Sequence, residues 1–155
     1  METSLLGLQV PDFEIASTGN TSFRLSGCRG SPLVIYFYPK DNTPGCTTEG
    51  QQFRDLFAEF RKLDCAVVGV SRDSLKSHEG FKAKMSFPFE LLSDADEKAC
   101  NLFGVIKMKN MYGKQVRGIE RSTFVIDGQG MVRAQWRGVK VPGHAQEVLE
   151  FAKSL

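Results

Sequence analysis

The segment LVIYFY at residues 33–38 is an almost unbroken run of apolar, strand-forming side chains, and AVVGVS at 66–71 is a second such run. Runs of this kind predict strands that are buried on both faces, because a solvated face would carry polar residues at alternate positions. Between the two runs, apolar residues recur at spacings of three and four. They predict a helix with one apolar face, formed by Phe53, Leu56, Phe57, Phe60 and Leu63.

The rest of the chain continues the alternation of strands and helices. The other predicted elements are a helix over 74–85, a strand over 89–94, a helix through Cys100 and Phe103, a strand-turn-strand hairpin over 121–136, and an amphipathic helix over 144–155. Asp94 or Asp96 would cap the second of these helices. The pattern predicts a single α/β domain over 1–155, with a mixed central sheet and helices on both faces, as in the thioredoxin-like architecture.

Composition and charge exclude several classes of protein. Apolar residues make up 41% and charged residues 25% of the 155 residues, as in ordinary globular domains. A net charge of +2 is too small to indicate nucleic acid or an anionic membrane as a partner. The locally basic stretch 106–117 is interpreted as a solvated face or loop. No apolar run approaches the roughly 18 residues that a membrane span needs.

The first residues and the cysteine spacing indicate a reducing compartment. Residues 1–14 show neither a basic nor an apolar leader region, so we expect no secretory signal and a cytoplasmic location. The cysteines are far apart, without a C-x-x-C pair, and both histidines, His78 and His144, are isolated in the sequence. This spacing predicts neither a disulfide scaffold nor a metal site.

One cysteine, Cys46, occupies an unusual place in the stretch YPKDNTPGCTTEG. If Thr43 is the N-cap of the first helix, Pro44 takes the first helical position, where its missing N–H costs nothing. Cys46 is then the third helical residue, whose side chain reaches back toward the N-cap. We expect its sulfur beside the Thr43 hydroxyl and the free N–H groups of the first turn. Those groups and the helix dipole favour a thiolate, which is the nucleophilic form of cysteine.

Each cysteine also has a purely structural interpretation as a small buried apolar side chain. That interpretation is preferred for Cys65, which lies within the apolar LDCAVVGVS, and also for Cys28 and Cys100. For Cys46 the T-P-G-C motif favours a chemical role instead.

The stretch YFYPKDNTPGCTTE resembles the active-site motif of the peroxiredoxins, in particular the bacterioferritin-comigratory-protein or PrxQ subfamily. The resemblance runs nearly the whole chain. It includes PDFEIASTGN, which is similar to the family's N-terminal hairpin, as well as SRDSLKSHEGF, LLSDADEKAC and NMYGKQVRGIERSTFVID in the same order. The resemblance therefore implies a thioredoxin-like fold with an N-terminal hairpin and an antioxidant thiol peroxidase activity.

The resemblance also implies a role for four residues. Cys46 would be the peroxidatic cysteine, and Thr43 would hydrogen-bond and orient the peroxide. Pro39 would shield the pocket from water, and Arg121 would hold the thiolate and polarise the peroxide. The alternative for Arg121 is a surface arginine on an edge strand. No cofactor or metal is implied, because the product of the thiolate attack is a sulfenic acid on Cys46.

The sequence departs from the family where many relatives carry a resolving cysteine. The position five residues after Cys46 is Gln51, and the position in the next helix corresponds to Lys82. We therefore expect a one-cysteine peroxidase that reduces hydrogen peroxide and organic hydroperoxides. Its sulfenic acid would be reduced by an external thiol, either glutathione with glutaredoxin or thioredoxin. The resemblance also suggests a monomer.

Two alternatives remain open at this point. The enzyme would be a two-cysteine peroxiredoxin if Cys100 or Cys28 acted as the resolving thiol. It would be a redox sensor or chaperone if a partner protein recognised the oxidised Cys46 and no catalytic turnover followed.

Overall fold

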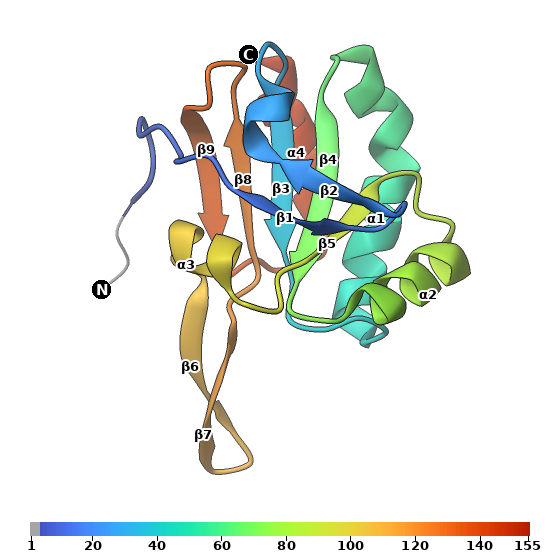
Figure 1. The fold of residues 1–155 in the computed structure, drawn as a ribbon, viewed down its shortest axis with the longest axis vertical. Coiled ribbons are helices and arrows are strands. Elements are labelled where there is room, and N and C mark those ends of the chain that lie inside the picture. Colours follow the sequence, from blue (N-terminus) through green and yellow to red (C-terminus); the bar gives the residue numbers. More distant parts are fainter. Residues whose placement is uncertain (1–3) are drawn as a thin grey trace.

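The computed structural model describes residues 4–155, and within them seven strands form one mixed sheet in the order β2-β1-β5-β4-β3-β8-β9 (Figure 1). These strands are β1 (Glu14–Ser17), β2 (Thr21–Arg24), β3 (Leu33–Phe37), β4 (Ala66–Ser71), β5 (Glu90–Ser93), β8 (Ser122–Ile126) and β9 (Val132–Arg137). β3, β4 and β5 are parallel, whereas β8 is antiparallel to β3 and β1 is antiparallel to β5. The sheet is therefore mixed, as the sequence predicted.

The central strand β3 is buried along its whole length because its two faces line two different cores. Leu33, Ile35 and Phe37 belong to the core on one side of the sheet. Val34 and Tyr36 belong to the core on the other side. The unbroken apolar run in the sequence is the direct consequence of this position.

Helices cover both faces of the sheet, as predicted (Figure 1). The helices are α1 (Pro44–Lys62), α2 (Leu75–Met85), α3 (Lys98–Phe103) and α4 (His144–Lys153), with a short 3-10 turn, η1, at Leu25–Cys28. α1, α2 and α4 contribute side chains to the same core as Tyr36, and α3 contributes to the core around Phe37. Asp94 caps α3, because its carboxylate accepts hydrogen bonds from the backbone N–H groups of Ala99 and Cys100.

The two predicted hairpins of the main sheet are confirmed. β1 and β2 form the N-terminal hairpin, and β8 pairs with β9 across the DGQG turn. The prediction that there is no secretory signal was based on residues 1–14. Residues 1–3 of this segment lie outside the part of the chain that the structure describes. Among residues 4–155, no helix has the length and apolar character that crossing a membrane requires.

The basic stretch 106–117 is solvated, as one of the two expected alternatives had it, but it is not a loop. It belongs to an antiparallel hairpin of β6 (Ile106–Met111) and β7 (Lys114–Ile119), which projects away from the main sheet (Figure 1). Tyr112 and Gly113 make the two-residue turn with φ of 52° and 77°, the positive values that a tight hairpin turn needs. The hairpin is solvated on its outer part, which is why its pattern of charges resembles that of a loop.

Candidate active site

Cys46 lies in the first turn of α1, at the end of the sheet where β3 passes into the helix. The helix begins at Pro44 with Thr43 as its N-cap residue, so Cys46 is the third helical residue, as predicted. The thiol is buried, with 2% of the residue exposed. The N–H groups of a first helical turn have no partner within the helix, so they present partial positive charge near this sulfur.

Thr43 occupies the N-cap position, as predicted, but its side chain does not cap the helix. Its Oγ1 donates a hydrogen bond to the carbonyl oxygen of Lys40 at 2.9 Å, and it makes no capping bond to a helical N–H. The hydroxyl is therefore oriented by the loop that precedes the helix. Pro39 lies in the same loop and is half-buried.

Arg121 reaches Cys46 from the other end of the chain. It directly precedes β8, whose first residue Ser122 pairs with Phe37 at the end of β3, and this register brings Arg121 over the start of α1. Its Nη2 donates to the Cys46 sulfur at 3.5 Å, while its Nη1 donates to Oε1 of Glu49 at 2.7 Å. One planar guanidinium thus bridges the thiol and a carboxylate.

Glu49 is the residue of this site that the sequence analysis missed. It lies one helical turn after Cys46, on the buried face of α1, and its side chain is 1% exposed. Burial raises the pKa of Glu49 to about 7 even though the Arg121 guanidinium acts in the opposite direction. The available signal was a glutamate three residues after the cysteine, on a helix face that is otherwise apolar.

The geometry therefore joins Cys46 and Glu49 through Arg121, which contacts both, with Thr43 and Pro39 in the adjoining loop. A buried thiol that receives a hydrogen bond from a cation can act as a stabilised nucleophile toward a small electrophile. The same cation is placed to stabilise negative charge that develops beside the sulfur.

A family model described as the AhpC/TSA family matches residues 6–135. The chain belongs to this family. Among the similar proteins, Peroxiredoxin Bcp of Xanthomonas campestris pv. campestris is 55% identical over 143 residues, which is 92% of this chain and 89% of the relative.

Solved structures agree with this assignment. A structure of the Xanthomonas campestris bacterioferritin comigratory protein matches with a TM-score of 0.88 and 54% identity, covering 92% of this chain and 90% of that one. A cysteine-to-serine mutant of Xylella fastidiosa PrxQ matches with a TM-score of 0.95 and 46% identity, covering 99% and 98%. The chain is a thiol peroxidase of the bacterioferritin-comigratory-protein/PrxQ subfamily, with the thioredoxin-like fold of the peroxiredoxins.

The other three cysteines of this peroxiredoxin lie away from the site. Cys100 is buried in the core on the opposite face of the sheet from Cys46, and Cys28 packs against that same core. Cys65 shares the core of Cys46 but lies beyond the far end of α1, where its N–H bonds to the carbonyl oxygen of Phe60. Burial raises the pKa of all three thiols, that of Cys65 to about 12.

Proposed function

We propose that this peroxiredoxin works by a one-cysteine mechanism, in which Cys46 reduces hydrogen peroxide and organic hydroperoxides and an external thiol then reduces Cys46. The observation that carries the proposal is the arrangement of the thiols. Cys46 has a cation within hydrogen-bonding distance, whereas the other cysteines lie across the sheet or at the far end of α1.

In the proposed reaction the Cys46 thiolate attacks the hydroxyl oxygen of the peroxide. The S–O bond forms as the O–O bond breaks, and the departing oxygen leaves as hydroxide or alkoxide and takes up a proton from water. Negative charge therefore moves from sulfur to the leaving oxygen. The Arg121 guanidinium and the first-turn N–H groups of α1 would stabilise both ends of this transfer because they are already oriented.

Thr43 and Pro39 have supporting roles in this proposal. The Thr43 hydroxyl would hydrogen-bond the peroxide and align its O–O bond with the sulfur. Half-buried Pro39 would limit the access of water to the pocket. Glu49 would hold Arg121 through the 2.7 Å bond, so that the other guanidinium nitrogen faces the sulfur.

The positions where relatives carry a resolving cysteine support a one-cysteine mechanism. Gln51 follows Cys46 in α1, and its amide contacts the Met85 sulfur at 3.8 Å. Lys82, in α2, forms an ion pair with Glu90 of β5. Neither side chain can form a disulfide, and the ion pair fastens α2 to the sheet.

The remaining cysteines are poor candidates for a resolving role on geometric grounds. Phe60, which neighbours Cys65, lies fourteen residues beyond Cys46 along α1, or about 21 Å of helix. A disulfide needs Cα atoms within about 7 Å. Cys100 and Cys28 would have to cross the sheet, so a bond to either would require extensive unfolding.

The proposal includes organic hydroperoxides among the substrates of the enzyme. The Xanthomonas relative has been studied for its alkyl peroxide reduction activity, which supports organic hydroperoxides as substrates here.

Because Cys46 is 2% exposed, an external thiol would reach its sulfenic acid only after the first turn of α1 opens. The thiol would be glutathione with glutaredoxin, or thioredoxin. We further propose that the enzyme acts as a cytoplasmic monomer.

Intact-mass measurement after one equivalent of peroxide tests the one-cysteine proposal. We expect the monomer to gain the mass of one oxygen, located at Cys46 by peptide mapping, because no thiol is close enough to condense with the sulfenic acid. A loss of two hydrogens that maps to Cys46 together with Cys28, Cys65 or Cys100 would refute the mechanism and leave the peroxidase activity untouched.

The Cys46→Ser variant is the control for this measurement. We expect it to gain no oxygen at position 46 and to consume no peroxide, because a serine hydroxyl is not ionised near neutral pH. Steady consumption of peroxide with a thiol donor would separate the enzyme from a redox sensor, which would react once and stop.

A further inference from the structure

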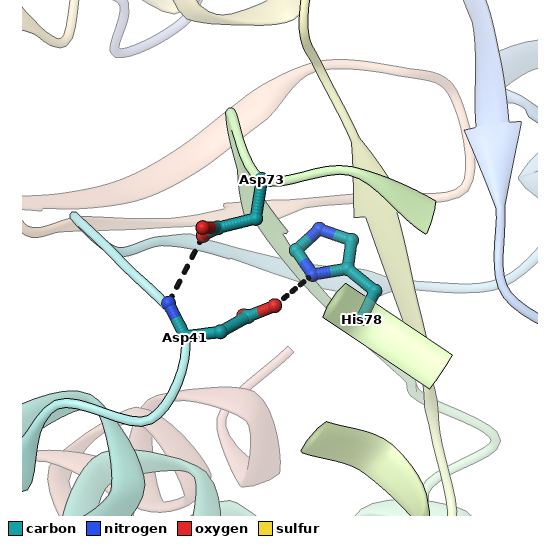
Figure 2. A group of neighbouring side chains, drawn as sticks. All are labelled: Asp41, Asp73 and His78. Carbon is teal, nitrogen blue, oxygen red and sulfur yellow. Dashed lines mark hydrogen bonds and ion pairs between the residues drawn. The ribbon is translucent and has the colours of Figure 1, made fainter. Parts of the chain in front are cut away.

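The loop between β3 and α1, residues 38–43, is anchored by a buried polar cluster formed by Asp41, Asp73 and His78 (Figure 2). Asp41 turns inward from the middle of this loop and is 4% exposed, and His78, on α2, is completely buried. Figure 2 shows the imidazole of His78 pointing at the Asp41 carboxylate and the carboxylate of Asp73 pointing at the Asp41 backbone nitrogen. A buried charged residue in a surface loop requires an explanation, because its desolvation is costly unless it is paired.

The Asp41 carboxylate accepts three hydrogen bonds from side chains. They come from the Tyr38 hydroxyl at 2.7 Å, the Ser77 hydroxyl at 2.8 Å and His78 Nδ1 at 2.7 Å. The backbone N–H of Asp41 donates to Asp73 Oδ2 at 3.0 Å. The bond from Tyr38 is internal to the loop, and the other contacts tie the loop at Asp41 to α2 and to the segment between β4 and α2.

Both ring nitrogens of His78 face hydrogen-bond acceptors. Its Nε2 lies 2.9 Å from the carbonyl oxygen of Leu92, and its Nδ1 lies 2.7 Å from the Asp41 carboxylate. Burial alone would raise the pKa of Asp41, but the hydrogen bonds from His78, Tyr38 and Ser77 outweigh it and lower that pKa. An ionised carboxylate only accepts hydrogen bonds, so Nδ1 of His78 is the donor of this pair.

A bound cation is not needed to account for this cluster. One ligand atom from each of Asp41, Asp73 and His78 lies within 4.8 Å of the others, a spacing at which the three could hold a metal ion. Here the Nδ1 lone pair that a metal would use is occupied by a proton shared with Asp41. Asp73 is likewise engaged, because it accepts from the Ser71 hydroxyl at 2.5 Å.

Asp41 is coupled to the catalytic threonine through the loop backbone. The carbonyl group that receives the Thr43 hydroxyl belongs to Lys40, the residue directly before Asp41. Between Asp41 and Thr43, Asn42 adopts a φ of 62°, a left-handed turn conformation that asparagine tolerates and that separates the two residues by one tight turn position. A shift of Asp41 would therefore move both the Lys40 carbonyl and the Thr43 hydroxyl.

We propose that His78 is a positioning residue for the peroxidase reaction, which holds the β3–α1 loop through Asp41 so that Thr43 faces the peroxide bound at Cys46. This inference rests on the role of Thr43 in the proposed function. Because His78 also bonds to Leu92 of β5, and Lys82 one turn later bonds to Glu90 of the same strand, α2 acts as the rigid support against which the loop is held.

The first test is whether Nδ1 of His78 carries the proton that bonds to Asp41, measured by nitrogen NMR of the side chain. We expect a protonated Nδ1, because this nitrogen lies 2.7 Å from a carboxylate that only accepts hydrogen bonds. His144 is the internal reference for a neutral ring, because burial lowers its pKa to about 4. An unprotonated Nδ1 at His78, with assignment checked in the His78→Gln variant, would overturn the inference.

The second test separates positioning from activation of the thiol. A small alkylating agent such as iodoacetamide reports on the Cys46 thiolate, whereas peroxide also requires Thr43 in place. In His78→Gln we expect the rate constant for peroxide to fall at least about tenfold, and the alkylation rate to change less than about twofold. If both rates fall together, or neither changes in folded protein, His78 does not position the loop.

Two further variants keep this test decisive. His78→Gln leaves a buried carboxylate unpaired and therefore destabilises the fold, whereas Ser77→Ala removes one hydrogen bond to Asp41 and no charge. We expect Ser77→Ala to lower the rate constant for peroxide by a smaller factor than His78→Gln does. The alkylation rate of Cys46 should stay at the parental value. Leu149→Ala, which removes buried side-chain volume from α4, is the control for lost stability and should keep the parental peroxide rate.

The failure of this inference can be told apart from the failure of the proposed function. If Thr43→Val reacts with peroxide at the parental rate, the role of Thr43 is wrong. If Thr43→Val is slow while His78→Gln and Ser77→Ala are not, Thr43 keeps its role and only the positioning by His78 is refuted.

Discussion

At the scale of single residues, Arg121 makes two contacts that need its particular shape. Its side chain is 17% exposed and bridges the Cys46 sulfur and the buried Glu49 carboxylate. The planar guanidinium can serve both because it presents several N–H donors in a fixed fork. A lysine ammonium would bring the same charge without the fork, so the two properties can be separated by mutation.

We expect Arg121→Ala to lower the rate of peroxide consumption by about two orders of magnitude, the usual loss when one donor to a developing anion is removed. Arg121→Lys should recover only part of the loss, because a point charge cannot bridge sulfur and carboxylate together. Stopped-flow measurement of the first oxidation would check this. Arg133→Lys, at an exposed ion pair of β9, is the matched control. Parental rates in both Arg121 variants would contradict the assignment.

At the scale of elements, α1 is fitted against the turn that follows α2. A Cβ added at Gly50 would lie 2.3 Å from Cζ of Phe87. Phe87 cannot move aside easily, because it stacks on Phe89 at a centroid distance of 5.1 Å and meets Phe81 edge-on at 5.1 Å. Gly50 therefore allows the close approach that holds α1, which carries Cys46, in place.

Gly50→Ala should lower the free energy of unfolding by about 1–3 kcal/mol, since overpacking outweighs the better helix propensity of alanine. Gly80→Ala in α2 is the matched substitution, because nothing lies within 4 Å of its added Cβ. It should raise the free energy of unfolding by about 0.5–1 kcal/mol. Urea denaturation of both variants measures the difference. Equal changes in the free energy of unfolding for the two substitutions would contradict this prediction. They would show that Phe87 makes room for the added methyl group without loss of stability.

At the scale of the whole molecule, two buried groups give opposite contributions to the pH dependence of stability. The pKa of His144 is lowered by burial from 6.5 to about 4, so its contribution is complete above about pH 6.5 and is lost as the pH falls toward 4. The pKa of Glu49 is raised from 4.5 to about 7, so its contribution is complete below about pH 4.5 and is lost as the pH rises toward 7. Between pH 6.5 and 4.5 the two contributions oppose one another.

Acidification from pH 7.5 to 5 should therefore separate the two variants. Relative to the parent, His144→Asn should gain stability on acidification, because the parent alone loses the contribution of a neutral buried imidazole. Glu49→Gln should lose stability relative to the parent, because it cannot take up the proton that Glu49 binds. Urea midpoints at the two pH values measure both. Differences from the parent that do not vary with pH would contradict the two protonation states.

The sequence by itself determined the elements and the place of Cys46 in the first helical turn. Both faces of β3 had to be buried because its residues are apolar without alternation, and α1 had to begin at Pro44 because proline is tolerated only in the first helical turn. Cys46 followed as the thiol at a helix N-terminus. These inferences succeeded because they depend on spacing within about a dozen residues, which propensity and periodicity describe directly.

Only the tertiary structure decided which side chains meet. The contact of Arg121 with Cys46 depends on the pairing of β8 with β3, and Glu49 becomes buried only when α1 packs on the sheet. His78, isolated in the sequence, meets Asp41 because α2 packs beside the β3–α1 loop. A local pattern carries no information about such long-range contacts, since they are selected by burial, strand register and the pairing of charges that the folded chain removes from water.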